Sequence, residues 1–202
     1  MLITTVGTQA QNLNATNGGF SEKKEINGKK YRQMFYEYEI NKTVDEVWAE
    51  VSGNYINVGD ISQSITHSHC ESGDTTEGLG AKRFCAIDFS GKEVRVKERI
   101  IEFKESDNRK AYTYEVYESQ GFPARVFNTW IVRKGNDGKT YLGNVFTFRA
   151  KPGFLTGMMA GKLRKLKATR NGVLAYKHYL ETGEKKVDPE IFDTMYPEPT
   201  IL

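Results

Sequence analysis

The chain has 202 residues, and its 29 basic and 26 acidic side chains leave a formal net charge of only +3. This length suits one domain with a substantial core, and the interspersed charges form no strongly basic surface, so we expect no nucleic-acid partner. No apolar run approaches the roughly eighteen residues of a membrane span and no secretion signal is visible, which predicts a cytoplasmic protein without membrane insertion.

The N-terminal segment is rich in Thr, Asn, Gln, Gly and Lys. It has too few apolar side chains to form a core, so residues 1–30 are predicted to be a flexible polar arm or a short peripheral hairpin. The domain begins with "YRQMFYEYEIN", residues 31–41, which is predicted to be an aromatic-rich strand. Thr43 can cap the next segment, 44–53, whose apolar residues recur at helical spacing.

The middle of the chain is predicted to be mostly extended. A short second helix is expected around residues 54–61, and an extended segment with two histidines follows it. From Gly80 the pattern changes to strands separated by turn residues, which predicts an antiparallel meander. The predicted strands of this meander cover residues 80–89, 92–103, 109–119, 123–134 and 139–151.

The C-terminal part is predicted to contain one long helix. Residues 154–183 have apolar side chains at a helical period, so this helix closes a domain that ends at residue 184. Three prolines among apolar residues follow, which predicts that residues 185–202 are an extended tail.

This order of elements predicts an α+β domain over residues 31–184. A curved antiparallel sheet of about seven strands wraps the long C-terminal helix, with two short helices after the first strand. The segments "VDEVWAEVSGNYINVGDIS", "GLGAKRF", "VKERIIEF", "FPARVFNTWIV" and "YLETGE", in this order, resemble the polyketide cyclase/dehydrase-like branch of the START and birch-pollen-allergen superfamily (SRPBCC). The resemblance implies a helix-grip fold whose cavity binds apolar or amphipathic molecules. It does not imply one chemistry, because such folds host carriers, receptors and cyclases.

Glu98 is the first candidate site residue. It resembles the glutamate of the superfamily's "ER" strand motif, which implies a side chain that points into the pocket. Alternation places Val96 and Glu98 on one strand face, and an apolar environment raises the pKa of a carboxyl group unless a cation compensates it. Arg83 resembles the arginine that follows the glycine opening the third strand, and it is expected to pair with Glu98 or to hold a ligand carboxylate. The alternative for both residues is an exposed position.

Further residues are predicted to line the pocket from strand alternation or from the resemblance. Alternation leaves open which face of the segment 126–131 points inward, and the resemblance favours Phe127 and Thr129. Core packing is the alternative role for the tyrosine and for the helical residues. Besides Arg83 and Glu98, the candidates are Cys85, Ile87, Val96, Tyr114, Val116, Phe127, Thr129, Met159 and Leu163.

The segment "SITHSHCES", residues 64–72, concentrates two of the three histidines. In a strand His67 and His69 share one face and Cys70 takes the other, so the three cannot bind one ion. No second ligand motif is present, so no metal and no cofactor are predicted, and the cysteines are expected to be thiols. His67 and His69 are candidate ligand contacts if their face of the strand points inward. The alternative is that the face with Ser68 and Cys70 points inward.

Three functions are compatible with these residues. The first is a carrier or sensor that binds a small hydrophobic or amphipathic molecule in a cavity, without covalent chemistry. The second is a polyketide cyclase- or dehydratase-like enzyme in which Glu98 transfers a proton and Arg83 or Tyr114 stabilises an enolate. The third is a structural or partner-binding protein whose cavity is filled by its own aromatic side chains. A ligand cavity is expected to exceed about 300 Å³, and a structure without one would count against both binding and catalysis. Glu98→Gln is expected to leave the fold intact.

Overall fold

The computed structural model describes residues 18–88, 91–120, 124–150 and 168–197. Eight strands are present: β1 (Gly18–Ile26), β2 (Lys29–Ile40), β3 (Ile65–His69), β4 (Lys82–Asp88), β5 (Glu93–Ser106), β6 (Arg109–Gln120), β7 (Ala124–Lys134) and β8 (Thr140–Ala150). The helices are α1 (Val44–Gly53), the 3₁₀ helix η2 (Val58–Asp60), α3 (Ala168–Thr182) and α4 (Pro189–Met195).

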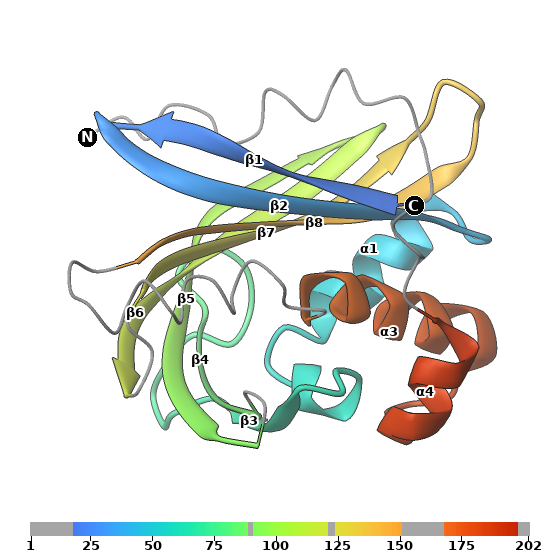
Figure 1. The fold of residues 1–202 in the computed structure, drawn as a ribbon. Coiled ribbons are helices and arrows are strands. Elements are labelled where there is room, and N and C mark those ends of the chain that lie inside the picture. Colours follow the sequence, from blue (N-terminus) through green and yellow to red (C-terminus); the bar gives the residue numbers. More distant parts are fainter. Residues whose placement is uncertain (1–17, 89–90, 121–123, 151–167, 198–202) are drawn as a thin grey trace.

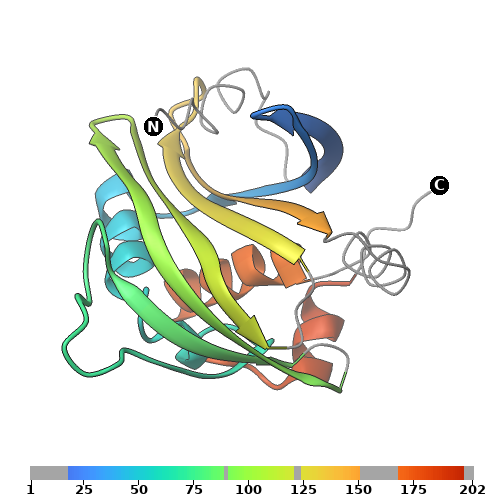
Figure 2. The same cartoon turned by 90° about the vertical axis from the view of Figure 1, so that its left-hand side faces the viewer.

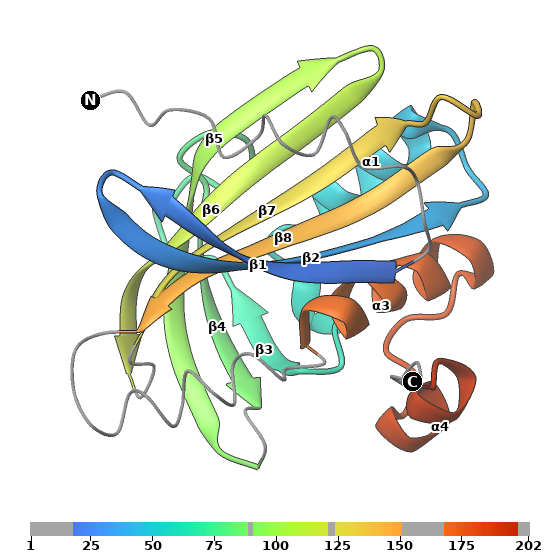
Figure 3. The same ribbon diagram turned by 45° about the horizontal axis from the view of Figure 1, so that its top comes forward.

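All eight strands form one antiparallel sheet in the order β1-β2-β8-β7-β6-β5-β4-β3. The sheet curves around α1 and α3, which lie on its concave face (Figures 1 and 2). This is the predicted helix-grip α+β fold, with eight strands instead of about seven. The additional strand is β1, which pairs with β2 at the edge of the sheet (Figure 3). Residues 18–30 therefore form a hairpin with the start of the domain, one of the two possibilities left open by the sequence.

Helix α1 begins at the predicted cap. The Thr43 hydroxyl accepts a hydrogen bond from the Glu46 backbone N–H, and the Glu46 carboxylate accepts one from the Thr43 N–H at 2.8 Å. This reciprocal pair satisfies two amide groups that a helix start leaves open. The buried Val47, Trp48 and Val51 then hold α1 against the inner face of the sheet.

The C-terminal tail is not extended as predicted. Residues 189–195 form α4, which begins with an Asp188 carboxylate that accepts from the Glu190 N–H at 2.9 Å. Pro189 occupies the first turn, where its missing N–H costs nothing. Phe192 is buried, and this burial stabilises a helix that is too short to be stable alone.

The described part of α3 confirms the predicted terminal helix over 168–182, and residues 151–167, including Met159 and Leu163, lie outside the described residues. Within the described ranges, no helix is both long and apolar enough to cross a bilayer.

The two faces of the central strands are both buried. The inner face packs against α1 and α3, and the outer face carries a separate cluster formed by Phe35, Ile131 and Val145. Polar side chains are also buried on the outer face, where the Arg133 Nε donates to the Glu37 carboxylate at 2.8 Å. The strands in this part of the sheet are therefore buried on both sides, with a mixed apolar and polar outer face.

Candidate functional site

A cavity of about 130 Å³ lies between the concave face of the sheet, the η2–β3 segment and α3. It is partly open to solvent, and its wall is mainly apolar. The described residues of the wall are Val58, Ser62, Ser64, Ile65, Arg83, Ile87, Val94, Val96, Glu98, Tyr114, Val116, Val126, Asn128, Trp130, Asn144, Phe146, Thr169, Gly172 and Tyr176.

The cavity is smaller than the sequence led us to expect. The reason is a stack of aromatic rings that fills the interior beside α1: the ring of Tyr112 lies 5.9 Å from Trp48 and 5.8 Å from Tyr55, measured between ring centroids. The ring of Phe103 packs against Trp48 at 5.3 Å and lies 6.5 Å from the ring of Tyr112. The open volume lies on the side of the interior that Gly172 and Tyr176 of α3 cover.

A buried ion pair forms part of the cavity wall. Arg83 on β4 and Glu98 on β5 are directly opposite in the strand register, and the Arg83 Nε donates to the Glu98 Oε2 at 2.6 Å. The two residues are only 3% and 4% exposed. The Arg83 guanidinium also packs over two adjacent aromatic rings, 4.2 Å from the centroid of Tyr55 and 4.8 Å from that of Tyr114. A further Arg83 nitrogen donates to the backbone carbonyl of Tyr55.

Of the two roles that the sequence allowed for Arg83, these contacts show the pairing with Glu98. The guanidinium is compensated by Glu98 and covered by rings, so it is paired inside the protein and is not free to hold a ligand carboxylate. Burial alone would lower the pKa of Arg83, but the Coulombic effects of Cys85 and Glu98 raise it above its ordinary value. The pair is thus a closed unit of opposite charges in an apolar wall.

Cys85 and Tyr114 keep their protons beside this pair. Burial raises the pKa of the Cys85 thiol to about 12, although Arg83 opposes the shift, and the thiol lies 3.8 Å from the Glu98 carboxylate as a hydrogen-bond donor. Both cysteines are free. Burial, followed by the charge of Glu98, also raises the pKa of Tyr114 well above its usual value. Neither group is a nucleophile at neutral pH, because the reactive form of a thiol is the thiolate.

Most of the β4, β5 and β6 candidates lie where the sequence placed them. The strand alternation around Glu98 is as predicted, and Cys85 lies on the same face as Arg83, buried against Glu98. The predicted residues that line the cavity are Arg83, Ile87, Val96, Glu98, Tyr114 and Val116.

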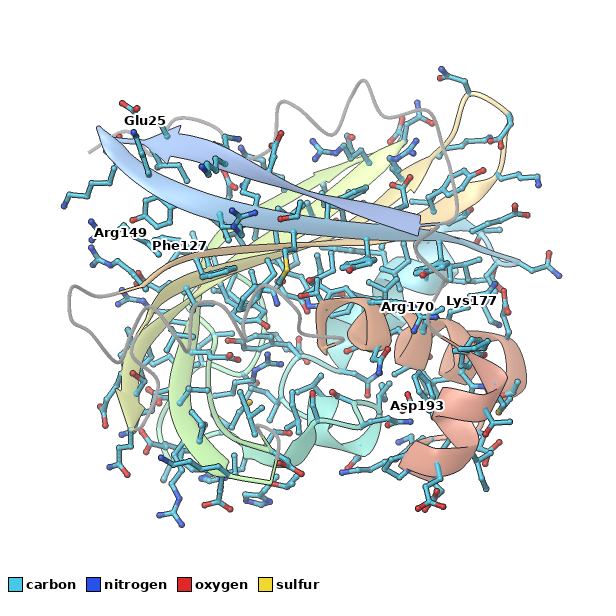
Figure 4. All side chains as sticks on the ribbon, viewed as in Figure 1. Glu25, Phe127, Arg149, Arg170, Lys177 and Asp193 are labelled. Atoms are coloured by element: carbon cyan, nitrogen blue, oxygen red, sulfur yellow. The ribbon has the colours of Figure 1, made fainter. Side chains whose placement is uncertain are left out.

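Phe127 and Thr129 are on the opposite face of β7, contrary to the prediction. The Thr129 hydroxyl lies 2.9 Å from the Thr113 hydroxyl, and the ring of Phe127 lies 6.1 Å from that of Tyr31. Phe127 and Arg149 lie toward one end of the sheet, far from the labelled residues of α3 (Figure 4). The intervening residues Val126, Asn128 and Trp130 line the cavity instead.

His67 and His69 point away from the cavity. Both are exposed, the Nδ1 of His69 lies 3.0 Å from the Nε2 of His67, and the ring of His69 packs on Phe84. Ser68 takes the inward face, where its hydroxyl accepts from the Gly59 N–H at 3.0 Å. Among the described residues, no group of three His, Cys, Asp or Glu side chains is arranged to hold a metal ion.

The sequence analysis missed several wall residues, and only one of them carried a recognisable signal. Gly172 lies inside a predicted helix, where glycine is unfavourable unless space is needed. Asn144, Trp130 and Tyr176 resemble ordinary core residues in the sequence. In the structure, the Nδ2 of Asn144 donates to the Oδ1 of Asn128, and the rings of Trp130 and Tyr176 pack edge to face at 5.0 Å.

Comparison with known proteins places this geometry in a family. Residues 34–171 match the family described as polyketide cyclase / dehydrase and lipid transport. No curated protein matches the sequence.

Solved structures share the fold. The Zhui aromatase/cyclase from Streptomyces sp. R1128 superposes with a TM-score of 0.61 at 15% identity, covering 75% of this chain and 94% of that chain. A START superfamily protein from Mycobacterium smegmatis gives 0.56 at 10% identity, covering 75% and 99%. Ara h 8.0201 gives 0.55 at 14% identity, also covering 75% and 99%. At these identities the likeness concerns the fold alone. Because the family match spans more than half of the sequence, the chain belongs to the polyketide cyclase/dehydrase and lipid transport family.

Proposed function

We propose that this protein binds a small, largely apolar molecule in the cavity between the sheet and α3, without covalent chemistry. The wall is mainly apolar, and its two charged groups, Arg83 and Glu98, compensate each other. Such a cavity excludes water from an apolar occupant and so favours binding through the hydrophobic effect.

Gly172 is the observation that supports binding over a merely incomplete core. It lies in the interior of α3 and on the cavity wall. A Cβ added there would meet Trp130 at 3.8 and 3.9 Å, which is ordinary van der Waals contact. Alanine therefore fits, and it would stabilise the helix by about 1 kcal/mol relative to glycine. A glycine at this position keeps volume open at the expense of stability.

The volume restricts the size of the occupant. The cavity has a volume of about 130 Å³. An engineered apolar cavity of about 150 Å³ in another protein binds benzene. The cavity thus suits a molecule with one ring.

The ion pair favours binding over acid–base catalysis. Glu98 lines the cavity, but its Oε2 is the atom that accepts the hydrogen bond from Arg83. To take part in proton transfer, Glu98 would have to give up its hydrogen bond to the buried Arg83 guanidinium, and separating a buried ion pair is costly. A catalytic cycle through Glu98 would meet this cost in every turnover, whereas ligand binding leaves the pair intact.

Fluorobenzene is a suitable probe for the proposal because ¹⁹F NMR detects its binding directly. We expect the wild-type protein to bind it, Gly172→Ala to weaken binding, and Gly172→Leu to abolish it while circular dichroism and cooperative unfolding show an intact fold. Gly53→Ala in α1 is the matched control, because an added Cβ there meets no atom within 4 Å. No binding by the wild type, or unchanged binding by Gly172→Leu, would refute the proposed function.

A further inference from the structure

We infer that the molecule bound in the cavity is electrically neutral and carries a hydroxyl group, which hydrogen-bonds to Asn144 and Tyr176. This inference rests on the proposed function and specifies the chemical class of its ligand. It depends on three observations: the charge balance of the wall, the unused hydrogen-bonding capacity of two side chains, and their common neighbour Trp130.

The charge balance of the described wall favours a neutral ligand. Among the described residues of the wall, Arg83 and Glu98 are the charged ones, and they are paired at 2.6 Å. A carboxylate or an ammonium group would find no uncompensated partner among these residues. Burial of an unpaired ion is far more costly than burial of a neutral polar group, so the wall selects against both signs of charge.

Asn144 has an acceptor that the protein does not use. The residue lies on β8, is 1% exposed and lines the cavity. Its Nδ2 donates to the Oδ1 of Asn128, while its own Oδ1 is buried without a hydrogen-bond partner. Buried amide oxygens are normally paired, so an unpaired one on a cavity wall indicates a partner that comes from the ligand. The terminal torsion of asparagine is soft, which lets the amide turn toward that ligand.

Tyr176 supplies a second unused group from the opposite side of the cavity. It lies on α3 and lines the cavity, and its hydroxyl is also buried without a partner. Burial raises the pKa of Tyr176, so the hydroxyl keeps its proton and can donate. The hydroxyls of Ser62 and Ser64, which also line the wall, differ in this respect because they lie 3.2 Å from each other.

Trp130 brings these two groups into one neighbourhood. It is directly opposite Asn144 in the pairing of β7 with β8, and its ring packs against the ring of Tyr176 at 5.0 Å. Because both residues are neighbours of Trp130, one ligand hydroxyl placed beside its ring can donate to the Asn144 Oδ1 and accept from the Tyr176 hydroxyl. A hydroxyl satisfies both groups because it is at once a donor and an acceptor.

Phenol and fluorobenzene form the decisive pair of probes, since they have nearly the same size and differ in the hydroxyl group. Fluorobenzene leaves water more readily, so a cavity without available polar groups binds it more tightly than phenol. We expect the wild-type protein to reverse this order and to bind phenol at least tenfold more tightly in calorimetric titrations. We expect cyclopentanol to bind, and the similarly sized cyclopentylammonium and cyclobutanecarboxylate ions to bind at least a hundredfold more weakly.

Two variants test the assigned residues. Tyr176→Phe removes a hydroxyl that makes no hydrogen bond in the protein, so the fold should be unaffected, while phenol affinity falls about tenfold and fluorobenzene affinity stays within twofold. Asn144→Leu also breaks the hydrogen bond to Asn128 and narrows the cavity, so its readout is the ratio of phenol to fluorobenzene affinity, which should fall about tenfold. Thr147→Val is the control on β8: it breaks the 2.8 Å hydrogen bond from Gln33 on the outer face and should leave the preference for phenol unchanged.

The outcomes separate this inference from the function on which it rests. If fluorobenzene binds and phenol binds no more tightly, the unused polar groups are satisfied by water and the inference is wrong, whereas the proposed function stands. If both variants retain the full preference for phenol, Asn144 and Tyr176 are not its partners. Equal affinity for the charged and neutral cyclic probes would overturn the assignment of a neutral ligand. If no probe binds, the proposed function itself fails.

Discussion

Arg83 and Glu98 show how a single pair of residues sets the polarity of the cavity. Two opposite charges directly across two strands are buried in an apolar wall, where each alone would be severely destabilising. Their mutual hydrogen bond, the two aromatic rings and the Tyr55 carbonyl replace the water that both groups lose. The result is a wall that contains ions and yet presents no net charge to a ligand.

The buried pair changes the expectation for Glu98→Gln. The sequence suggested a harmless substitution, but glutamine leaves the Arg83 guanidinium buried without a counter-charge, which costs about 3–5 kcal/mol. We expect a loss of this size in the free energy of unfolding measured with urea. Arg83→Met should cost a similar amount, and the double variant should be much less destabilised than the sum of the two single variants, because it removes both charges together.

An exposed ion pair on β5, the strand of Glu98, gives the control for these substitutions. Glu93 accepts from Arg95 at 2.7 Å, and their side chains are 51% and 59% exposed. Glu93→Gln should leave the unfolding free energy unchanged within error, because exposed ion pairs contribute little. A Glu98→Gln variant as stable as Glu93→Gln, or additive effects in the double variant, would show that the buried pair does not act as a unit.

At the scale of elements, alternation in the sequence identifies the inner face of a strand only where the other face is polar. In β5 the inward Val96 and Glu98 alternate with Arg95, Lys97 and Arg99, so the inner face was predicted correctly. In β7 both faces are buried, and the apolar Phe127 and Ile131 on the outer face look the same in sequence as the inner residues. The resemblance to relatives then favoured the wrong face. Register and curvature, which decide the question, are properties of the whole sheet.

Helix α4 has a different reason for being missed. Its seven residues are too few for a helical period, and the prolines around it suggested an extended chain. The start signal was nevertheless present, because Asp188 followed by Pro189 is a typical helix beginning. What makes the helix stable is burial of Phe192, together with hydrogen bonds from Arg170 to the carbonyls of Tyr196 and Pro197 at 3.0 and 2.7 Å.

Two neighbouring residues of α4 test whether burial holds this helix in place. Phe192 is 1% exposed and Ile191 is 56% exposed. Phe192→Ala should lower the free energy of unfolding by about 3–5 kcal/mol, the usual cost of truncating a buried aromatic residue. Ile191→Ala should change it by less than about 0.5 kcal/mol. Equal effects of the two substitutions would mean that α4 is not anchored through Phe192.

The same substitution should affect one wall of the cavity. The Lys186 Nζ donates to the carbonyls of Gly59 and Ile65 at 3.1 and 2.9 Å, so the segment before α4 is tied to the η2–β3 segment. If α4 detaches from the core, Lys186 is no longer held in place, and its hydrogen bonds to the η2–β3 segment weaken. We expect amide hydrogen exchange to accelerate in residues 58–65 of Phe192→Ala, and to be unchanged there in Ile191→Ala.

At the scale of the whole molecule, the interior has two parts with opposite packing. Beside α1, rings of Trp48, Tyr55, Phe103 and Tyr112 fill the space, and beside α3 a cavity remains open. The eleven tyrosines and eleven phenylalanines made some filling predictable. Composition could not indicate that the rings gather on one side, since this depends on which strand face each one occupies.

This division predicts that stability and ligand affinity are controlled by different residues. Tyr112 is buried in the aromatic part and does not line the cavity. Tyr112→Leu should therefore lower the free energy of unfolding by about 2–3 kcal/mol, as large-to-small core substitutions do, and leave the affinity for fluorobenzene unchanged. Gly172→Ala should raise the stability by up to about 1 kcal/mol and lower the affinity, because the added methyl group favours the helix and occupies the cavity.

The two variants should thus change different properties. The free energy of unfolding is measured by urea denaturation, and the affinity for fluorobenzene by ¹⁹F NMR titration. A packed core that merely happened to be imperfect would behave differently, because filling its void with Gly172→Ala would improve stability and there would be no affinity to lose. If Tyr112→Leu weakened fluorobenzene binding as much as it weakened the fold, the aromatic and open parts would form one deformable interior. A stable Tyr112→Leu protein with normal affinity, beside a more stable Gly172→Ala protein with reduced affinity, would establish that the aromatic part stabilises the fold and that the space beside α3 is kept open for a ligand.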